Sequence, residues 1–340
     1  IPNQEDRLRH IVENMVYGAE LQEVPYLMTR RAFSRLFNYK FNLFHGNMVE
    51  GIEGLSNMKF DVVVMNPPYN KPVHEKGRRG GYGGRTLWDK FLEKSIEEWL
   101  SPDGHMCSVN PSGWRKPPSP RSPTLFSKIS HENQLVGLSI YSKRQGQIAF
   151  GASTRYDTIC LHKTPPYMNT KVKDELGNKT ELDLSKHAWI PNYFFEDIFS
   201  LLADDESERT KVIFSSSIYD TRKKHISKEK TSKNHLPIVH TMTLKGHSCV
   251  YSSEDKGHFG IPKVILSFNE IQRCPINDWK GEYGMSQIAF AIPVDSEEDG
   301  ERLVDFMMSE QGKQIVAATK WSTFQTDWRL FTYFKEGFWR

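Results

Sequence analysis

The sequence contains few cysteines and no long apolar run. Its 340 residues include four cysteines, none of them in CxxC spacing. That scarcity argues against a structural zinc site and against a disulfide framework, so we expect no metal and a reducing, cytoplasmic location. No run of about 18 apolar residues occurs, so we expect no membrane span. The net charge is only +3, so bulk charge does not by itself indicate a nucleic-acid partner.

The chain is long enough for two domains, since 38% of its 340 residues are hydrophobic. Residues 10–163 alternate strand-like and helix-like runs, which is typical of an α/β fold with a mostly parallel sheet. A boundary at Lys163-Thr164-Pro165-Pro166 would give domains 1–164 and 165–340. The predicted strands are 15–21, 42–46, 60–65, 105–110, 135–140 and 156–162, and the predicted helices are 5–14, 24–37 and 87–100.

The sequence pattern of the second half predicts a mixed α+β domain. A hairpin is expected over Thr170 to Asp183, with its turn at Leu176-Gly177-Asn178, and Ser296 is expected to cap a helix. The expected helices are 192–203, 296–309 and about 310–319, and the β-like runs are 211–219, 236–244, 248–251, 262–268 and 285–293. No catalytic constellation is found in this half, so we interpret it as a recognition domain.

Asn66-Pro67-Pro68-Tyr69 is the most informative motif. It follows the strand-like run 60–65, so a rigid polar turn lies at the carboxyl end of a strand, where ligands of open α/β sheets bind. The two prolines fix φ and remove two N–H donors. Nearby oxygens are then held as hydrogen-bond acceptors beside an aromatic ring. An exocyclic amino group that attacks a methyl group requires those parts, although a plain strand-ending turn is the alternative.

These residues resemble the S-adenosylmethionine-dependent amino-methyltransferases, most closely the N6-adenine DNA methyltransferases, including Eco57I-like type II modification methylases. Other stretches match in the family's order, and these are 15–21, 42–47, 87–91 and 104–114. The resemblance covers roughly residues 10–163. It implies a Rossmann-like class I methyltransferase domain followed by a target-recognition domain. It also implies S-adenosylmethionine as cofactor and a flipped adenine of double-stranded DNA as substrate.

The resemblance also implies roles for individual residues. In the family the catalytic turn grips the adenine N6 amino group, which assigns catalysis to Asn66, Pro67, Pro68 and Tyr69, with Tyr69 stacking on the base. The cofactor would be bound by Glu20, Leu21, Asn47, Met48, Asn66 and Trp88, and either Trp88 or Phe91 could touch its adenine. Glu20 suits the ribose hydroxyls because a carboxylate accepts two hydrogen bonds. Phe150 is either a second wall for the flipped base or a core residue.

Basic residues cluster in two segments. Residues 71–85 hold five basic residues and five glycines, and we expect DNA to order this segment over the active site. A second cluster occupies 222–233, and residues 114–118 would extend a basic rim. The predicted DNA contacts are Lys71, Arg78, Arg79, Arg85, Arg115, Lys223 and Lys224. A solvated surface is the alternative for each segment.

The family's Gly-rich cofactor loop is not found before Met15. Residues 1–14 contain no glycine and resemble the helix that follows this loop, so we expect the loop in an upstream segment. If the loop is truly absent, a non-catalytic DNA-binding subunit is the alternative. Methylation of RNA or of a protein glutamine also stays open. The expected setting is a restriction-modification or orphan modification system, with a restriction or modification subunit as a partner.

Overall fold

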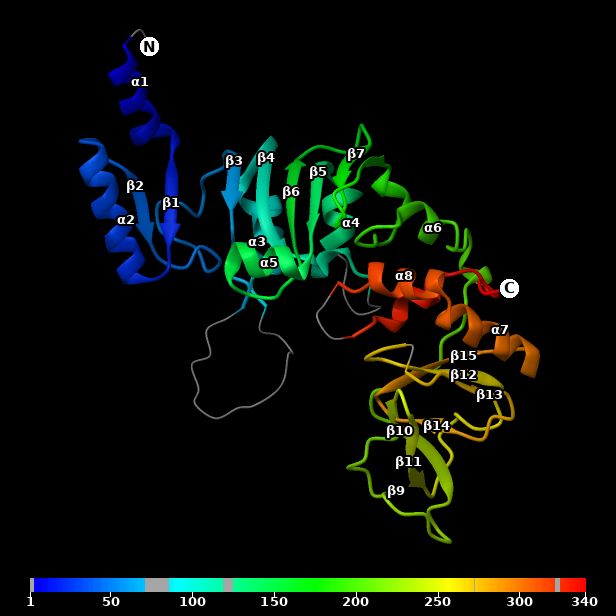
Figure 1. Ribbon diagram of the computed structural model, residues 1–340. Helices are drawn as coiled ribbons and strands as arrows, with labels where there is room; N and C mark the ends of the chain where they lie inside the picture. The colour runs from blue at the N-terminus through cyan, green and yellow to red at the C-terminus, as the bar shows by residue number, and fades with distance from the viewer. Residues whose placement is uncertain (1–2, 71–85, 119–124, 272, 322–324) are drawn as a thin grey trace. The chain divides into compact units, whose positions relative to one another are not determined.

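The computed structural model describes residues 3–70, 86–118, 125–271, 273–321 and 325–340 (Figure 1). The chain forms two compact units. The first comprises 1–108 and 160–164, and the second comprises 109–159 and 165–340. These limits differ from the expected boundary at 164, because residues 109–159 cluster with the C-terminal half. The functional division into catalysis and recognition stays a prediction.

The first unit begins with helices and a small parallel sheet. Asn3 caps α1, because its side-chain oxygen accepts a hydrogen bond from the Glu5 N–H at 2.9 Å. Strands β1 and β2 pair in parallel. The elements are α1 Gln4–His10, the π-helix Ile11–Met15, β1 Tyr17–Glu20, α2 Glu23–Leu36 and β2 Asn42–His45. The helices and strands predicted for this region are therefore confirmed within a few residues.

A six-stranded sheet follows, with strand order β3-β4-β6-β5-β7-β8. Its strands are β3 Phe60–Met65, β4 Leu100–Pro111, β5 Gln134–Tyr141, β6 Tyr156–His162, β7 Thr170–Lys173 and β8 Lys179–Leu182. The pairs β3–β4 and β5–β7 are parallel, and β7–β8 is antiparallel. The expected α/β class is thus confirmed. The predicted hairpin is also found, with Gly177 at φ +95° in its turn, but its strands extend the sheet of the first half.

Helices accompany this sheet, and two of them were not predicted. The accompanying helices are α3 Trp88–Lys94, the π-helix Ser95–Trp99, the 3-10 helix Ser112–Arg115, α4 Leu125–Ser130 and α5 Lys143–Phe150. Helix α3 with its π-helical continuation confirms the predicted helix 87–100. Helices α4 and α5 were missed, although α5 carries a capping box between Ser142 and Gln145 and ends at Gly151 with φ +68°.

The parallel strands form two sheets and not one. Among the described residues, no strand pairs with the second edge of β1 or of β3. Strand β3 is therefore an edge strand, although its run of valines is typical of a buried parallel strand. Val62 is 60% exposed and Val64 is 78% exposed.

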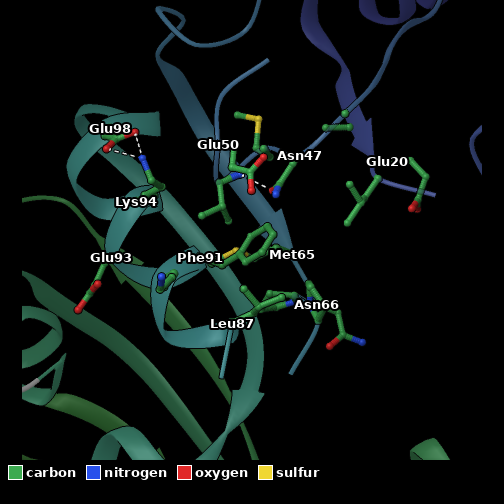
Figure 2. A pocket seen from close by; sticks show the side chains of 18 of the residues that line it. Glu20, Asn47, Glu50, Met65, Asn66, Leu87, Phe91, Glu93, Lys94 and Glu98 are labelled. Carbon is green, nitrogen blue, oxygen red and sulfur yellow. Dashed lines mark hydrogen bonds and ion pairs between the residues drawn. The ribbon is translucent and has the colours of Figure 1, made fainter. Parts of the chain in front are cut away.

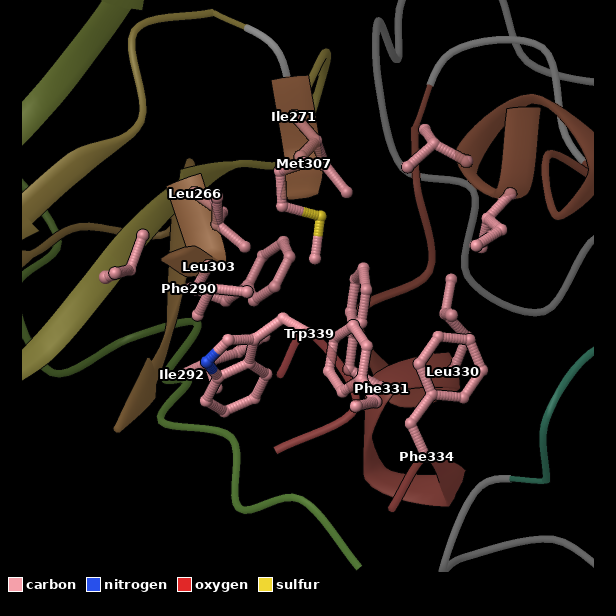
Figure 3. Close-up of a cluster of buried hydrophobic side chains, with 14 of the residues drawn as sticks. Leu266, Ile271, Phe290, Ile292, Leu303, Met307, Leu330, Phe331, Phe334 and Trp339 are labelled. Carbon is pink, nitrogen blue, oxygen red and sulfur yellow. The ribbon is translucent and has the colours of Figure 1, made fainter. Parts of the chain in front are cut away.

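The second unit contains a large aromatic core. It includes Trp189. Figure 3 shows Phe290, Phe331, Phe334 and Trp339 of the same core. The remaining elements are α6 Phe195–Phe199, β9 Ile226–Ser227, β10 Leu236–Thr243, β11 Gly246–Ser252, β12 Lys263–Ser267, β13 Ile276–Asp278, β14 Gly284–Met285, β15 Ala289–Pro293, α7 Glu297–Met308 and α8 Glu310–Ala318, with three short 3-10 helices, Leu184–Lys186, Glu206–Glu208 and Trp328–Tyr333. No helix among the described residues is both long and apolar enough to cross a bilayer.

Several predictions for the second unit are confirmed and others are wrong. Ser296 caps α7, because its hydroxyl oxygen accepts from the Asp299 N–H at 3.2 Å. The runs 236–244, 248–251 and 262–268 correspond to β10, β11 and β12. The run 211–219 is not a strand and contributes one isolated bridge, from Ile213 to Ala291. The predicted helix 192–203 shrinks to α6, and 285–293 divides into β14 and β15.

Candidate functional site

A cavity of about 1250 Å³ lies within the first unit. Four chain segments supply its walls: the end of β1, the turn after β2, the end of β3 with the residues that follow it, and helix α3 (Figure 2). The predicted residues that line the cavity are Glu20, Leu21, Asn47, Met48, Asn66, Pro67 and Pro68. Residues far apart in the sequence therefore meet at the carboxyl ends of β1, β2 and β3, which belong to two different sheets.

The Asn66 side chain is presented to this cavity by a rigid turn. Strand β3 ends at Met65, Asn66 is exposed, and Pro67 is buried. Within the part of the chain that the structure describes, the Asn66 amide makes no hydrogen bond. Its oxygen and nitrogen are therefore free to bind a ligand.

The chain returns to this turn after residue 85. The Leu87 N–H donates to the Tyr69 carbonyl at 3.1 Å, and Asn70 forms a bridge with Thr86. The Thr86 hydroxyl donates to the Asp89 carboxylate at 2.9 Å, next to the start of α3. The turn and the helix are thereby held together. Tyr69 is half-buried and does not line the cavity, so its stacking role stays a prediction.

Glu20 and Asn47 add polar atoms to the cavity that Asn66 lines. Glu20 is the last residue of β1, and its Oε1 accepts a hydrogen bond from the Gln22 N–H at 2.8 Å. This contact orients the carboxylate. The Asn47 Oδ1 accepts from the Val49 N–H at 3.1 Å, which shapes the turn after β2. The carboxylate of Glu20 and the amide nitrogen of Asn47 remain available to a bound molecule.

Helix α3 gives the cavity an apolar wall. Leu87 and Phe91 lie one helical turn apart and line the cavity, whereas Trp88 does not. The expected contact from this helix is therefore corrected from Trp88 to Phe91. The reason is the position of each residue around the helix axis. Each residue is rotated by about 100° from the one before it, so Trp88 and Phe91 project in different directions. The ion pair of Lys94 with Glu98, at 2.7 Å, also lines the cavity.

Phe150 belongs to the second unit and is the last residue of α5. It is 43% exposed, and its ring meets Tyr156 edge-on at 4.9 Å. Tyr156 in turn stacks on Tyr141 at 4.5 Å. Phe150 is therefore not a fully buried core residue, because part of it is exposed. Its role beside a base stays a prediction.

Arg115 is not part of a basic surface, which corrects the sequence interpretation. Its side chain is completely buried and pairs with Asp157, with the Arg115 Nε 2.8 Å and Nη2 3.0 Å from the carboxylate oxygens. Trp114 also donates to Asp157, and Asn192 accepts from Arg115. A buried charge requires such partners. Arg115 therefore connects segments of the second unit and does not contact phosphate.

The structure describes only one of the two basic clusters predicted from the sequence. Lys71, Arg78, Arg79 and Arg85 lie outside the described residues. Lys223 and Lys224 are exposed in the second unit, in the loop before β9. Both side chains are accessible to a binding partner, but their contact with phosphate stays a prediction.

Comparison with protein families gives one match. The family model described as Eco57I restriction-modification methylase matches residues 4–145. This match confirms the resemblance based on the catalytic turn, and it spans both β1 and β3. No curated protein matches the chain.

Several solved structures are similar to parts of the chain. A structure of a type I R-M system has 18% identity and a TM-score of 0.39, covering 54% of this chain and 39% of its own. The modification subunit of a putative type I restriction enzyme from Vibrio vulnificus YJ016 has 16% identity and a TM-score of 0.37, covering 51% and 37%. The type IIL restriction-modification enzyme MmeI, solved with DNA, has 8% identity and a TM-score of 0.48, covering 94% and 54%. None of these TM-scores reaches 0.5, so none assigns a function. The chain spans about two fifths of the first two structures.

Proposed function

We propose that this chain, whose residues 4–145 match the family model described as Eco57I restriction-modification methylase, methylates the N6 amino group of a flipped adenine in double-stranded DNA. The observation that carries the proposal is the Asn66 amide. It directly follows the parallel strand β3, has no hydrogen-bond partner among the described residues, and lines the same cavity as Glu20 and Asn47.

The proposed chemistry depends on hydrogen-bond acceptors at the turn. An adenine amino nitrogen is a poor nucleophile because its lone pair is delocalised into the ring. The Asn66 side-chain oxygen and the Pro67 carbonyl would accept its two hydrogens and draw the nitrogen toward tetrahedral geometry. The same fixed dipoles would stabilise the positive charge that develops on nitrogen. Positioning supplies much of the remaining acceleration, so no strong general base is needed.

The cavity fits S-adenosylmethionine as the cofactor, which supplies the methyl group when bound. The Glu20 carboxylate lies at a strand end, where it would accept hydrogen bonds from ribose hydroxyls. Met48 and Phe91 offer apolar surface for an adenine ring, and Asn47 offers an amide. A volume of about 1250 Å³ has room for the cofactor and a flipped base together. The Gly-rich loop expected upstream stays a prediction.

A DNA substrate is supported by the charge of the second unit. The segment 222–233 contains six cations and one acid, Glu229. Lys223, Lys224 and Lys228 are exposed there. Such a cluster would neutralise backbone phosphates. We therefore assign recognition to residues 165–340, in a restriction-modification or orphan modification system with a restriction or modification subunit as partner.

The test uses the full-length protein with methyl-labelled S-adenosylmethionine and separate samples of DNA, RNA and protein. We expect label in DNA alone, and no label in DNA with Asn66→Ala. Label in RNA or in protein glutamine would contradict the substrate assignment. If no polymer is labelled and titration calorimetry detects no cofactor binding, the chain is a non-catalytic DNA-binding subunit.

A further inference from the structure

The side chains of the hairpin of β10 and β11 are buried near its base and partly exposed near its turn. Near its base both faces are covered. Ile238 and Val250 pack with Tyr219 on one face, and Val239 packs with Met285 on the other. This half of the hairpin therefore belongs to the core of the second unit.

Near the turn, one face of the same hairpin is bare. Thr241 lies opposite Ser248 in the register, and both are exposed, whereas Met242 between the two threonines is buried on the other face. A register irregularity between Val239 and Thr241 precedes this stretch. An extra residue in a strand rotates the side chains that follow it. The irregularity thus accounts for a polar face that continues from an apolar one.

The hydroxyls on this face differ in their partners. The Thr243 hydroxyl bonds within the turn, donating to the Gly246 carbonyl at 3.1 Å and accepting from the Lys245 N–H at 3.2 Å. The hydroxyls of Thr241 and Ser248 have no partner among the residues that the structure describes. Each can therefore donate and accept one hydrogen bond with an external molecule.

The turn presents an apolar side chain beside a cation. Leu244 is 82% exposed, and Lys245 next to it is exposed as well. An isolated leucine at a hairpin tip has no folding role here, because nothing covers it. In the same four-stranded sheet, β9 lies within the segment 222–233 and pairs with β11 at Tyr251 and Ser252. The exposed lysines next to β9 therefore belong to the base half of the hairpin, and Lys245 is the cation next to the polar face.

We infer that residues 241–248, the tip half of this hairpin, read base-pair edges in a groove of duplex DNA. The inference rests on the proposed DNA substrate. The major groove, about 12 Å wide, admits a two-stranded ribbon, and hydroxyl side chains bond to any base edge there. Thr241 and Ser248 would supply these bonds, and Leu244 would contact a thymine methyl group from the tip. Lysines 223 and 224 would bind phosphate and carry no sequence information.

The experiment selects bound duplexes from a randomised DNA library with the full-length protein and sequences them. The variants are the double substitution Thr241→Ala with Ser248→Ala, and separately Leu244→Ala. All three side chains are exposed, so the thermal midpoint should not change. Thr180→Ala in β8 is a matched control, since it removes a strand threonine hydroxyl in another hairpin of the same unit.

We expect the wild type and the control to select the same sequence. The double variant should lose discrimination at one or two base pairs by about fivefold or more. Its affinity for unrelated DNA should change less than about twofold, because its phosphate contacts are intact. Leu244→Ala should lower discrimination at a base pair that contains thymine.

The outcomes separate this inference from the proposed function. If the wild type neither binds nor methylates DNA, the proposed function fails and the inference fails with it. If the wild type selects a sequence that the double variant selects with equal discrimination, the hairpin does not read bases, while the proposed function stands. An equal loss of affinity for all sequences in the double variant would also overturn the inference, since it would make the face a phosphate contact.

Discussion

Replacing Asn66 with alanine should abolish most methyl transfer while leaving the protein folded. The side chain is exposed and has no hydrogen-bond partner among the described residues. Its loss should therefore change the free energy of unfolding by no more than about 0.5 kcal/mol. Removing one preorganised polar group from a charge-stabilising site typically lowers kcat by about 10² to 10³, or ~2.7–4 kcal/mol in activation free energy. The effect on catalysis should thus exceed the effect on stability severalfold.

The assay measures kcat and KM for DNA, cofactor affinity by calorimetry, and urea unfolding for each variant. Asn38→Ala is the matched control, because Asn38 is also an exposed asparagine of the first unit and lies outside the cavity. Asn66→Asp keeps acceptor oxygens at the same position, so it should retain more activity than alanine. A near wild-type kcat in Asn66→Ala, or a loss fully explained by unfolding, would refute the assignment of Asn66 to catalysis.

Three further predictions concern the cofactor, the DNA backbone and acid stability. Glu20→Ala should weaken S-adenosylmethionine binding more than DNA binding in calorimetry, because the carboxylate is expected to bind the ribose hydroxyls of the cofactor. Lys223→Ala with Lys224→Ala should lower affinity for all DNA sequences alike and reduce the salt slope of log K by about 0.9 for each phosphate that is no longer neutralised. Hydrogen bonding from Arg340 lowers the pKa of Asp299 to about 2 from its ordinary 3.8. That stabilisation, about 2 kcal/mol, is complete above pH 3.8 and disappears as the pH falls from 3.8 to about 2, and Asp299→Asn should abolish it in urea unfolding.

The predictions on the cofactor and on the DNA backbone each have a matched control. Glu23→Ala removes an exposed acid that does not line the cavity and should leave cofactor affinity unchanged. Lys313→Ala removes an exposed lysine of α8 and should leave the salt slope unchanged. Equal cofactor affinity in Glu20→Ala and in the wild type would show that the Glu20 carboxylate does not bind the cofactor. Unfolding of Asp299→Asn that retains the wild-type pH dependence between 4 and 2 would show that other carboxylates account for the acid sensitivity.

The catalytic turn could be predicted because its signal is local. The apolar run of β3 and the two prolines after Asn66 specify a strand and a rigid turn without reference to distant residues. The convergence of Glu20, Asn47 and Asn66 on one cavity was implied by the family resemblance, which assigns all three to the cofactor site. The hairpin of β7 and β8 was found for a similar reason, since Gly177 marks its turn.

The misses came from interactions between residues far apart in the sequence. Arg115 sits in a polar stretch typical of a surface loop, and its burial depends on Asp157, 42 residues away. Trp88 and Phe91 could not be ranked without the phase of α3 relative to the cavity. The exposed valines of β3 show the same limit, because an apolar strand sequence does not reveal which of its edges is paired. The exposed hairpin face at Thr241 was missed because a register irregularity between Val239 and Thr241 changes which side chains lie on that face.

Nucleoside analysis of DNA treated with the full-length protein and S-adenosylmethionine tests the central claim most directly. The DNA would be digested to nucleosides after the reaction and analysed by mass spectrometry. The account predicts N6-methyl-2′-deoxyadenosine in DNA treated with wild-type protein, and at most about one hundredth as much at equal time with Asn66→Ala. A methyl group on any other atom or polymer, or an equal yield from the alanine variant, would contradict it.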